Sequence, residues 1–153
     1  MKRIGIISDT HGRIRQWALD VLKGAHMILH AGDIGSPDVI DELQALAPVV
    51  AVRGNMDKGA WSYDYNLTEA LEIDNRFIYM IHDKAQLDLA PAGQFDTVIS
   101  GHTHLPEATV KDGVLYFNPG SAGHRRFGKP VSIGILEISA TGIEPHIIKM
   151  DDQ

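Results

Sequence analysis

Short apolar runs alternate with longer mixed stretches in the first third of the chain. The apolar runs are typical of buried strands, and each is closed by turn-forming residues. They cover residues 3–8, 26–30 and 49–53. The stretches between them predict helices over residues 14–23 and 37–47, the second opened by a serine N-cap and a proline at its first position. Strands that alternate with helices in this order predict a parallel sheet flanked by helices.

The rest of the chain has the pattern of a β-rich region. Three pairs of strand-like stretches are separated by two-residue turn signals, Asp74-Asn75, Asp112-Gly113 and Thr141-Gly142. The predicted strands cover residues 67–73, 76–81, 97–100, 108–111, 114–117, 133–138 and 143–150. Because tight turns join strands that run in opposite directions, we expect this half to be mainly antiparallel.

Composition places the chain among soluble globular proteins. At 153 residues it is long enough for one domain with a core, and we expect residues 1–153 to form a single domain. Hydrophobic residues at 44% and charged residues at 22% are ordinary for that class, and the net charge of -6 disfavours general nucleic-acid binding. The sequence has neither the pattern of a signal peptide nor that of a membrane span, so the default expectation is a cytoplasmic location.

Seven residues with metal-binding side chains lie just beyond the predicted strand ends. They are Asp9, His11, Asp33, Asn55, His82, His102 and His104. Ligands collect beyond the carboxyl ends of strands in open α/β sheets, because the loops converge there. Neighbouring glycines supply permissive backbone for the sharp turns that bring two side chains onto one ion. The carboxylate of Asp33 can place one oxygen on each of two ions.

The chemistry of this set is that of a centre for two divalent ions. The chain has no cysteine, so a metal must be bound by oxygen and nitrogen, which suits Mn, Fe, Zn, Co or Ni. Two ions about 3.5 to 4 Å apart activate a bridging water and hold the attacking and leaving oxygens of a phosphoryl transfer. We therefore expect phosphoester hydrolysis by a hydroxide that bridges the two metals.

Five spaced motifs resemble those of a known superfamily. They are D-x-H at Asp9, G-D at Asp33, G-N at Asn55, a lone histidine at His82 and G-H-x-H at His102. In this order they resemble the calcineurin-like metallophosphoesterase superfamily over roughly four fifths of the chain. The G-N-x-D form of the third motif and the later N-P-G-S at residues 118–121 are most similar to small bacterial and archaeal phosphodiesterases. The resemblance implies an α/β fold, a four-layer α/β/β/α sandwich of two mixed β-sheets.

The resemblance also implies a role for each candidate residue. The first metal would be bound by Asp9, His11 and His104. The second would be bound by Asn55, His82 and His102, with Asp33 bridging the two ions. Asn55, which in this family can also touch the substrate phosphate, and His82 are the candidate catalytic residues beside a metal-bound hydroxide. The implied cofactors are two divalent ions, Mn first, with Fe, Zn, Ni or Co as alternatives.

The function implied is that of a metal-dependent phosphodiesterase acting on a small phosphodiester. A broad-specificity phosphomonoesterase shares the metals and stays an alternative. A non-catalytic scaffold is another, because a retromer subunit resembles the same superfamily and uses its surface for protein assembly. Relatives often self-associate, so a homo-oligomer is possible, whereas we expect neither a membrane partner nor general nucleic-acid binding.

Two positions depart from the family pattern. Met56 stands where many members carry a histidine that is thought to protonate the leaving group, so we expect activity biased toward esters with good leaving groups. Asp83 stands where members have glycine after the lone histidine, and it can take the left-handed backbone that glycine favours. The next residue, Lys84, is predicted to attract the substrate phosphate.

Three further positions are candidates for supporting roles. His30 lies three residues before Asp33 and could support the metal-binding side chains from behind. Asp57 could steady the loop that carries Asn55 or cap the segment that follows, and the sequence favours neither. Backbone amides of residues 118–121 could form a nest for the substrate phosphate.

Overall fold

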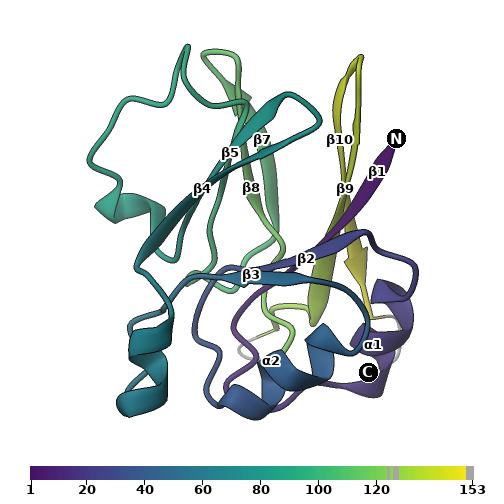
Figure 1. The fold of residues 1–153 in the computed structure, drawn as a ribbon, viewed down its shortest axis with the longest axis vertical. Coiled ribbons are helices and arrows are strands. Elements are labelled where there is room, and N and C mark those ends of the chain that lie inside the picture. Colours follow the sequence, from purple (N-terminus) through teal and green to yellow (C-terminus); the bar gives the residue numbers. More distant parts are fainter. Residues whose placement is uncertain (124, 126–127, 151–153) are drawn as a thin grey trace.

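Two five-stranded β-sheets packed face to face dominate the computed structural model, which describes residues 1–123, 125 and 128–150 (Figure 1). The first sheet has the strand order β10-β9-β1-β2-β3, and the second has the order β4-β5-β6-β8-β7. Each sheet contains both parallel and antiparallel pairs. The predicted sandwich of two mixed sheets is therefore confirmed.

The first sheet is built around the predicted succession of strands and helices. Its parallel strands are β1 (Lys2–Ile7), β2 (Met27–His30) and β3 (Val49–Ala51). They are connected by α1 (Gln16–Leu22) and α2 (Pro37–Gln44). As predicted, Ser36 caps α2, since its hydroxyl accepts a hydrogen bond from the backbone N–H of Asp38. β9 (Ser132–Ser139) runs antiparallel to β1 and to the edge strand β10 (Gly142–Lys149).

The second sheet is less antiparallel than the turn signals predicted. The hairpin of β4 (Thr68–Ile73) and β5 (Arg76–Ile81) forms as expected, as does that of β7 (Glu107–Lys111) and β8 (Val114–Asn118). However, β6 (Thr97–Ile99) lies between β5 and β8 and is parallel to both. The prediction was wrong at β6 because long connections return the chain to the same end of the sheet, which no local turn signal reveals.

The central core fills the space between the two sheets. Ile4 and Ile6 of β1 belong to one buried cluster with Met80 of β5 and Phe117 of β8. The inner side of β9 must leave room for the aromatic ring, because a Cβ at Gly134 would lie 2.4 Å from the ring of Phe117. Ile4 and Ile6 lie two positions apart on β1, so their side chains point to the same face of the first sheet. The positions between them point to the opposite face, as in any strand that is covered on both faces.

The outer faces of the two sheets are covered differently. α1 and α2 pack on the first sheet, where Leu22 and Leu43 share a cluster with Ile7. The second sheet is covered by the segment of residues 84–95, which includes only the short 3₁₀ turn η2 (Lys84–Gln86). A second 3₁₀ segment, η1 (Ala60–Asp64), follows the loop after β3. None of the helices in the described residues is long and apolar enough to cross a membrane.

The loops after the strands of both sheets meet at one edge of the sandwich. The backbone N–H of Asp9, after β1, donates to the carbonyl of Gly32, after β2. In the second sheet, the N–H of Gly101, after β6, donates to the carbonyl of His82, after β5. A hydrogen bond between His82 Nδ1 and the carbonyl of Ala31 joins the two sets of loops. The candidate ligands therefore arrive at one place from both sheets.

Candidate metal centre

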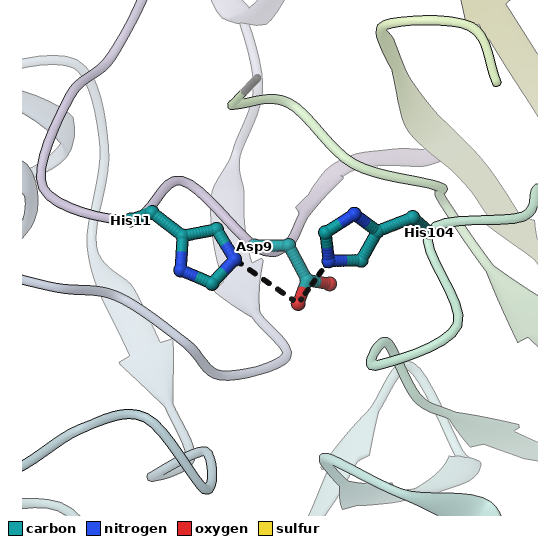
Figure 2. A group of neighbouring side chains, drawn as sticks. All are labelled: Asp9, His11 and His104. Atoms are coloured by element: carbon teal, nitrogen blue, oxygen red, sulfur yellow. Dashed lines mark ion pairs between the residues drawn. The ribbon is translucent and has the colours of Figure 1, made fainter. Parts of the chain in front are cut away.

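One carboxylate oxygen lies at the centre of the site. Oδ1 of Asp9 is 3.4 Å from Nε2 of His104 and 3.9 Å from Nε2 of both His11 and His82. Figure 2 shows the rings of His11 and His104 turned toward this oxygen from opposite sides. Asp9, His11 and His104 form one group, whose ligand atoms lie within 4.8 Å of one another.

A second group shares the carboxylate of Asp9. It consists of Asp9, Asp33 and His82, with Oδ2 of Asp33 lying 3.2 Å from Nε2 of His82. The same oxygen lies 3.9 Å from Nε2 of His11, which belongs to the first group. Asp33 thus faces both groups through Oδ2, while its Oδ1 accepts a hydrogen bond from the N–H of Met56. The expected placement of one oxygen on each ion stays a prediction.

The hydrogen bonds at the centre leave some ligand atoms without partners. The side chain of Asp9 is fully buried, and its Oδ2 accepts hydrogen bonds from Ser8 Oγ and the N–H of His102. In contrast, Asp9 Oδ1 and His82 Nε2 are buried without a hydrogen bond to any described residue, although Nε2 of His82 lies 3.2 Å from Oδ2 of Asp33. Buried polar atoms are rarely left unsatisfied. A divalent cation between them would satisfy both, so the donor set fits the metal that the sequence predicts.

His82 is oriented as a metal-binding imidazole. Its Nδ1 lies 2.7 Å from the carbonyl of Ala31, which can only accept, so Nδ1 carries the proton and Nε2 faces the carboxylates. Burial alone lowers the pKa of His82, but the nearby carboxylates of Asp33 and Asp9 outweigh it and raise the pKa above its usual value. Burial likewise opposes ionisation of Asp33, yet contacts with His82, the N–H of Met56 and His11 lower its pKa. The two carboxylates therefore favour a positive charge at Nε2 of His82. A bound cation would supply that charge in place of a proton.

Backbone strain is concentrated at this site. Five of the seven candidate ligands have the left-handed backbone conformation that side chains rarely adopt. They are Asp9 (φ 57°), His11 (φ 50°), Asp33 (φ 55°), His102 (φ 74°) and His104 (φ 62°). The other described non-glycine residues with positive φ are at hairpin turns: Asp74, Asn75 and Asp112. Such conformations cost about 1–3 kcal/mol each and gather at functional sites.

Two motif glycines are required by close packing at the same place. A Cβ at Gly54 would lie 2.2 Å from the backbone nitrogen of Asp33. A Cβ at Gly101 would lie 2.0 Å from Ser8 Oγ and 2.7 Å from Asp9 Oδ2. The glycines of the G-N and G-H-x-H motifs therefore allow loops of different strands to approach the two buried carboxylates.

Asn55 and His102 lie outside the two tight groups. Both are exposed, and Oδ1 of Asn55 is 3.2 Å from Nδ1 of His102. The ring of His102 is 5.2 Å from that of His82, centroid to centroid, and all three residues line one cavity. The structure therefore brings five candidate ligands into direct proximity and places the other two together beside His82.

The departures after His82 differ from expectation. Asp83 has extended backbone (φ −116°, ψ 110°), and the left-handed conformation considered for it was wrong. Its Oδ1 accepts a hydrogen bond from the N–H of Ala85 and caps η2. Lys84 points instead to β7, where Nζ donates to Glu107 Oε1 at 2.6 Å, and it does not line the cavity beside His82. Its predicted phosphate contact is not supported, because proximity in sequence did not place it on the same face.

Asp57 steadies the metal-binding loops. Its two carboxylate oxygens accept hydrogen bonds from the N–H groups of Gly35 (2.9 Å) and Gly54 (2.8 Å). It thereby ties the loop of Asp33 to the loop of Asn55. Of the two roles that the sequence left open for Asp57, the structure favours this one.

His30 supports the site through a chain of hydrogen bonds. Its Nδ1 accepts from the N–H of Gly32, so Nε2 carries the proton and donates to Thr10 Oγ1, which in turn donates to the carbonyl of Ile34. The ring is completely buried, and this burial lowers the pKa of His30 to about 3. A neutral His30 therefore joins the loops that carry Asp9 and Asp33, as expected of a residue behind the ligands.

The turn at residues 118–121 is a brace and not an anion nest. The side-chain amide of Asn118 donates to the carbonyl of Gly101, and its oxygen accepts from the N–H of Gly120. The prediction of a phosphate nest is not supported, because Gly120 uses its amide within the turn. Asn118 instead fixes the start of the loop that carries His102 and His104.

The fold and the site define a phosphoesterase class, and comparisons with known proteins agree. The calcineurin-like phosphoesterase superfamily domain matches residues 1–141, and the chain belongs to this superfamily. A probable metallophosphoesterase of Methanothermobacter thermautotrophicus is 35% identical over 159 residues, covering 95% of this chain and 91% of the relative. A phosphodiesterase of Methanocaldococcus jannaschii is 33% identical over 154 residues, covering 88% of this chain and 92% of the relative.

Solved structures resemble the whole chain. A novel archaeal phosphodiesterase superposes with a TM-score of 0.77 and 28% identity, covering 95% of this chain and 99% of that one. Wild-type Vps29 of Entamoeba histolytica, complexed with Zn²⁺, superposes with a TM-score of 0.74 and 24% identity, covering 96% and 98% of the two chains. The second likeness shows a shared fold alone.

Proposed function

We propose that the protein is a phosphodiesterase that depends on two divalent metal ions. The observation that carries this proposal is the pair of ligand groups sharing Asp9, in which buried atoms of Asp9 and His82 have no hydrogen-bond partner among the described residues. Membership of the calcineurin-like phosphoesterase superfamily and the phosphodiesterases among the relatives support the reaction class.

The residues fall into two ligand sets. Asp9, His11 and His104 would hold the first ion, and His82, Asn55 and His102 would hold the second, with Asp33 between them. Bound ions would supply an activated water as nucleophile and positive charge for the transition state. Oxygen and nitrogen donors of this kind suit Mn²⁺, our first choice, and also Fe, Zn, Ni or Co.

Two neighbouring residues would affect the reaction directly: Asn55 through the substrate phosphate, and Met56 because it cannot protonate the leaving group. Asn55 projects from an exposed loop beside His102, where its amide can contact the substrate phosphate as well as a metal. The next residue, Met56, is exposed and has no proton to donate to a leaving group. We therefore propose small phosphodiesters with good leaving groups as the substrates.

Hydrolysis of bis-p-nitrophenyl phosphate by chelator-treated protein, with and without Mn²⁺, tests the proposal. We expect turnover only with metal, and a lower kcat/KM for the monoester p-nitrophenyl phosphate. Asp33→Asn should abolish turnover, whereas the exposed control Asp41→Asn should not. Folded protein that binds none of the candidate metals, or binds them without turnover, would overturn the proposal and favour the scaffold alternative.

A further inference from the structure

A cavity of about 490 Å³ opens directly beside the second ligand set. Asn55, His82 and His102 are among the residues that line it. Leu67 and Thr68, at the start of β4, line it as well. Its size is within the range of pockets that hold small organic ligands, roughly 300–1,000 Å³.

Arg53 is an uncompensated cation in this cavity. It lies directly after β3, where its backbone N–H donates to the carbonyl of Asn66. The guanidinium carbon lies 4.9 Å from the centre of the Tyr63 ring, which fixes the side chain by a cation–π contact. Arg53 is the only Lys or Arg among the described residues that line the cavity, and none of the described carboxylates forms an ion pair with it. Its hydrogen-bond donors are therefore available to an anionic group.

Exposed apolar side chains gather around the same segment. Met56 is 58% exposed, Tyr63 is 77% exposed, and Leu67 is 59% exposed. Of these three, Leu67 lines the cavity and Tyr63 contacts the guanidinium of Arg53. Two carboxylates, Asp83 and Asp88, line the cavity as well. Asp83 lies 3.7 Å from Nε2 of His102, and neither carboxylate forms an ion pair with Arg53 among the described residues.

We propose that this cavity binds the second ester arm of the substrate, and that the arm has a bulky apolar body and an anionic group that contacts Arg53. This inference rests on the proposed phosphodiesterase function. A diester held by the metal-binding residues loses one arm as the leaving group, so the retained arm must extend into neighbouring space. The cavity beside Asn55 and His102 supplies that space, and Leu67 and Arg53 supply complementary chemistry.

Three p-nitrophenyl diesters with the same leaving group test this assignment. Their second arms are methyl, 4-carbamoylphenyl and 4-carboxyphenyl, so the last two differ mainly in charge. For wild-type, Mn²⁺-loaded protein we expect kcat/KM to rise in that order, by about tenfold at the last step, as a charge-assisted hydrogen bond would give. Arg53→Gln should remove the preference for the carboxylate over the amide. Lys58→Gln removes the same charge from an exposed, non-lining residue of the same loop and should retain the preference.

Leu67→Ser examines the apolar part of the assignment. It should reduce the preference for the carbamoylphenyl arm over methyl by about threefold, as expected for partial loss of a buried apolar contact. A wild-type protein indifferent to the arm would overturn the assignment. So would an Arg53→Gln variant that slows all three diesters equally, because Arg53 would then act on the phosphate they share.

Failure of the proposed function gives a separate result. If loaded protein hydrolyses none of the diesters, they serve as stable ligands, and calorimetry measures the ratio of their Kd values in place of the kcat/KM ratio. A retained tenfold preference that depends on Arg53 would support the cavity assignment without phosphodiesterase activity. Equal Kd values for the amide and carboxylate arms would overturn it.

Discussion

Oδ2 of Asp83 lies 3.7 Å from Nε2 of His102, while Nδ1 of the same ring lies 3.2 Å from Oδ1 of Asn55. The amide oxygen of Asn55 can only accept, so Nδ1 carries the proton of a neutral His102 ring and Nε2 keeps its lone pair. A cation beside Nε2 would therefore be attracted by both this lone pair and the carboxylate of Asp83. In the proposed centre, Asp83 is a positioning residue that supports the second ion at Nε2 of His102.

Asp83→Asn should weaken binding of the second metal ion. The variant keeps the size of the side chain and an oxygen for the N–H of Ala85, but it loses the negative charge beside His102. Loss of such a support costs about tenfold to a hundredfold in metal affinity. Calorimetric titration with Mn²⁺ should show one unchanged site and one weakened site.

Asp88→Asn is the matched control for this prediction. Asp88 lines the same cavity and is exposed, but no described histidine forms an ion pair with it. Equal weakening in both variants would mean that general negative charge attracts the ion. Unchanged affinity in Asp83→Asn would show that Asp83 does not support the second ion at His102.

His30 should make the protein sensitive to acid. Its pKa is about 3 in the folded state and about 6.5 in the unfolded chain, so the unfolded chain binds more protons between these values. Stability from the neutral ring is complete above the unfolded pKa and is lost as pH falls toward the folded pKa. Between about pH 7.5 and about pH 5 the loss attributable to His30 is about 2 kcal/mol.

Urea unfolding of wild type and His30→Asn at these two pH values measures this contribution. The variant should be less stable at the higher pH, because it disturbs the bonds to Gly32 and Thr10. Between the two pH values, its free energy of unfolding should also fall by about 2 kcal/mol less than that of wild type. The same pH dependence in wild type and His30→Asn would contradict the assignment.

Most of the candidate centre was predictable because its residues follow strands in a fixed order. Asp9, Asp33 and His82 could be placed at strand ends from local patterns, and parallel pairing then brought those ends together. The register of β6 between β5 and β8 was not predictable, since it depends on long connections. The outer face of the second sheet is covered by residues 84–95, which include the short 3₁₀ turn η2 in place of an α-helix.

Residues that act through spatial neighbours were harder to identify. Arg53 gave no signal, because its setting depends on Tyr63 and Leu67, which reach it only through the path of the chain after β3. Lys84 was misplaced for the opposite reason, since it follows His82 closely in sequence but pairs with Glu107 on another face. Spacing in the sequence thus predicted the candidate ligands at strand ends better than it predicted which residues line the neighbouring cavity.

Asp57→Ala should destabilise the protein without removing a candidate ligand. The buried carboxylate accepts the N–H groups of Gly35 and Gly54, and its loss leaves both donors unsatisfied. We expect a loss of roughly 3 kcal/mol in the free energy of unfolding, measured with urea in the presence of chelator. The exposed Asp64→Ala should change it by less than about 0.5 kcal/mol. Similar values for the two variants would contradict the bracing role.

Asp9→Asn should separate stability from metal binding. The new amide can keep an oxygen toward Ser8 Oγ and the N–H of His102, while it removes a buried charge whose Oδ1 has no hydrogen bond to a described residue. Without metal, the variant should therefore unfold at the same Tm as wild type or a higher one. Mn²⁺ should raise the Tm of wild type, because it binds the folded state, and should leave that of the variant nearly unchanged. Thermal unfolding with chelator and with Mn²⁺ measures both effects. A variant that is less stable in chelator yet still stabilised by Mn²⁺ would show that Asp9 serves the fold and not the metal.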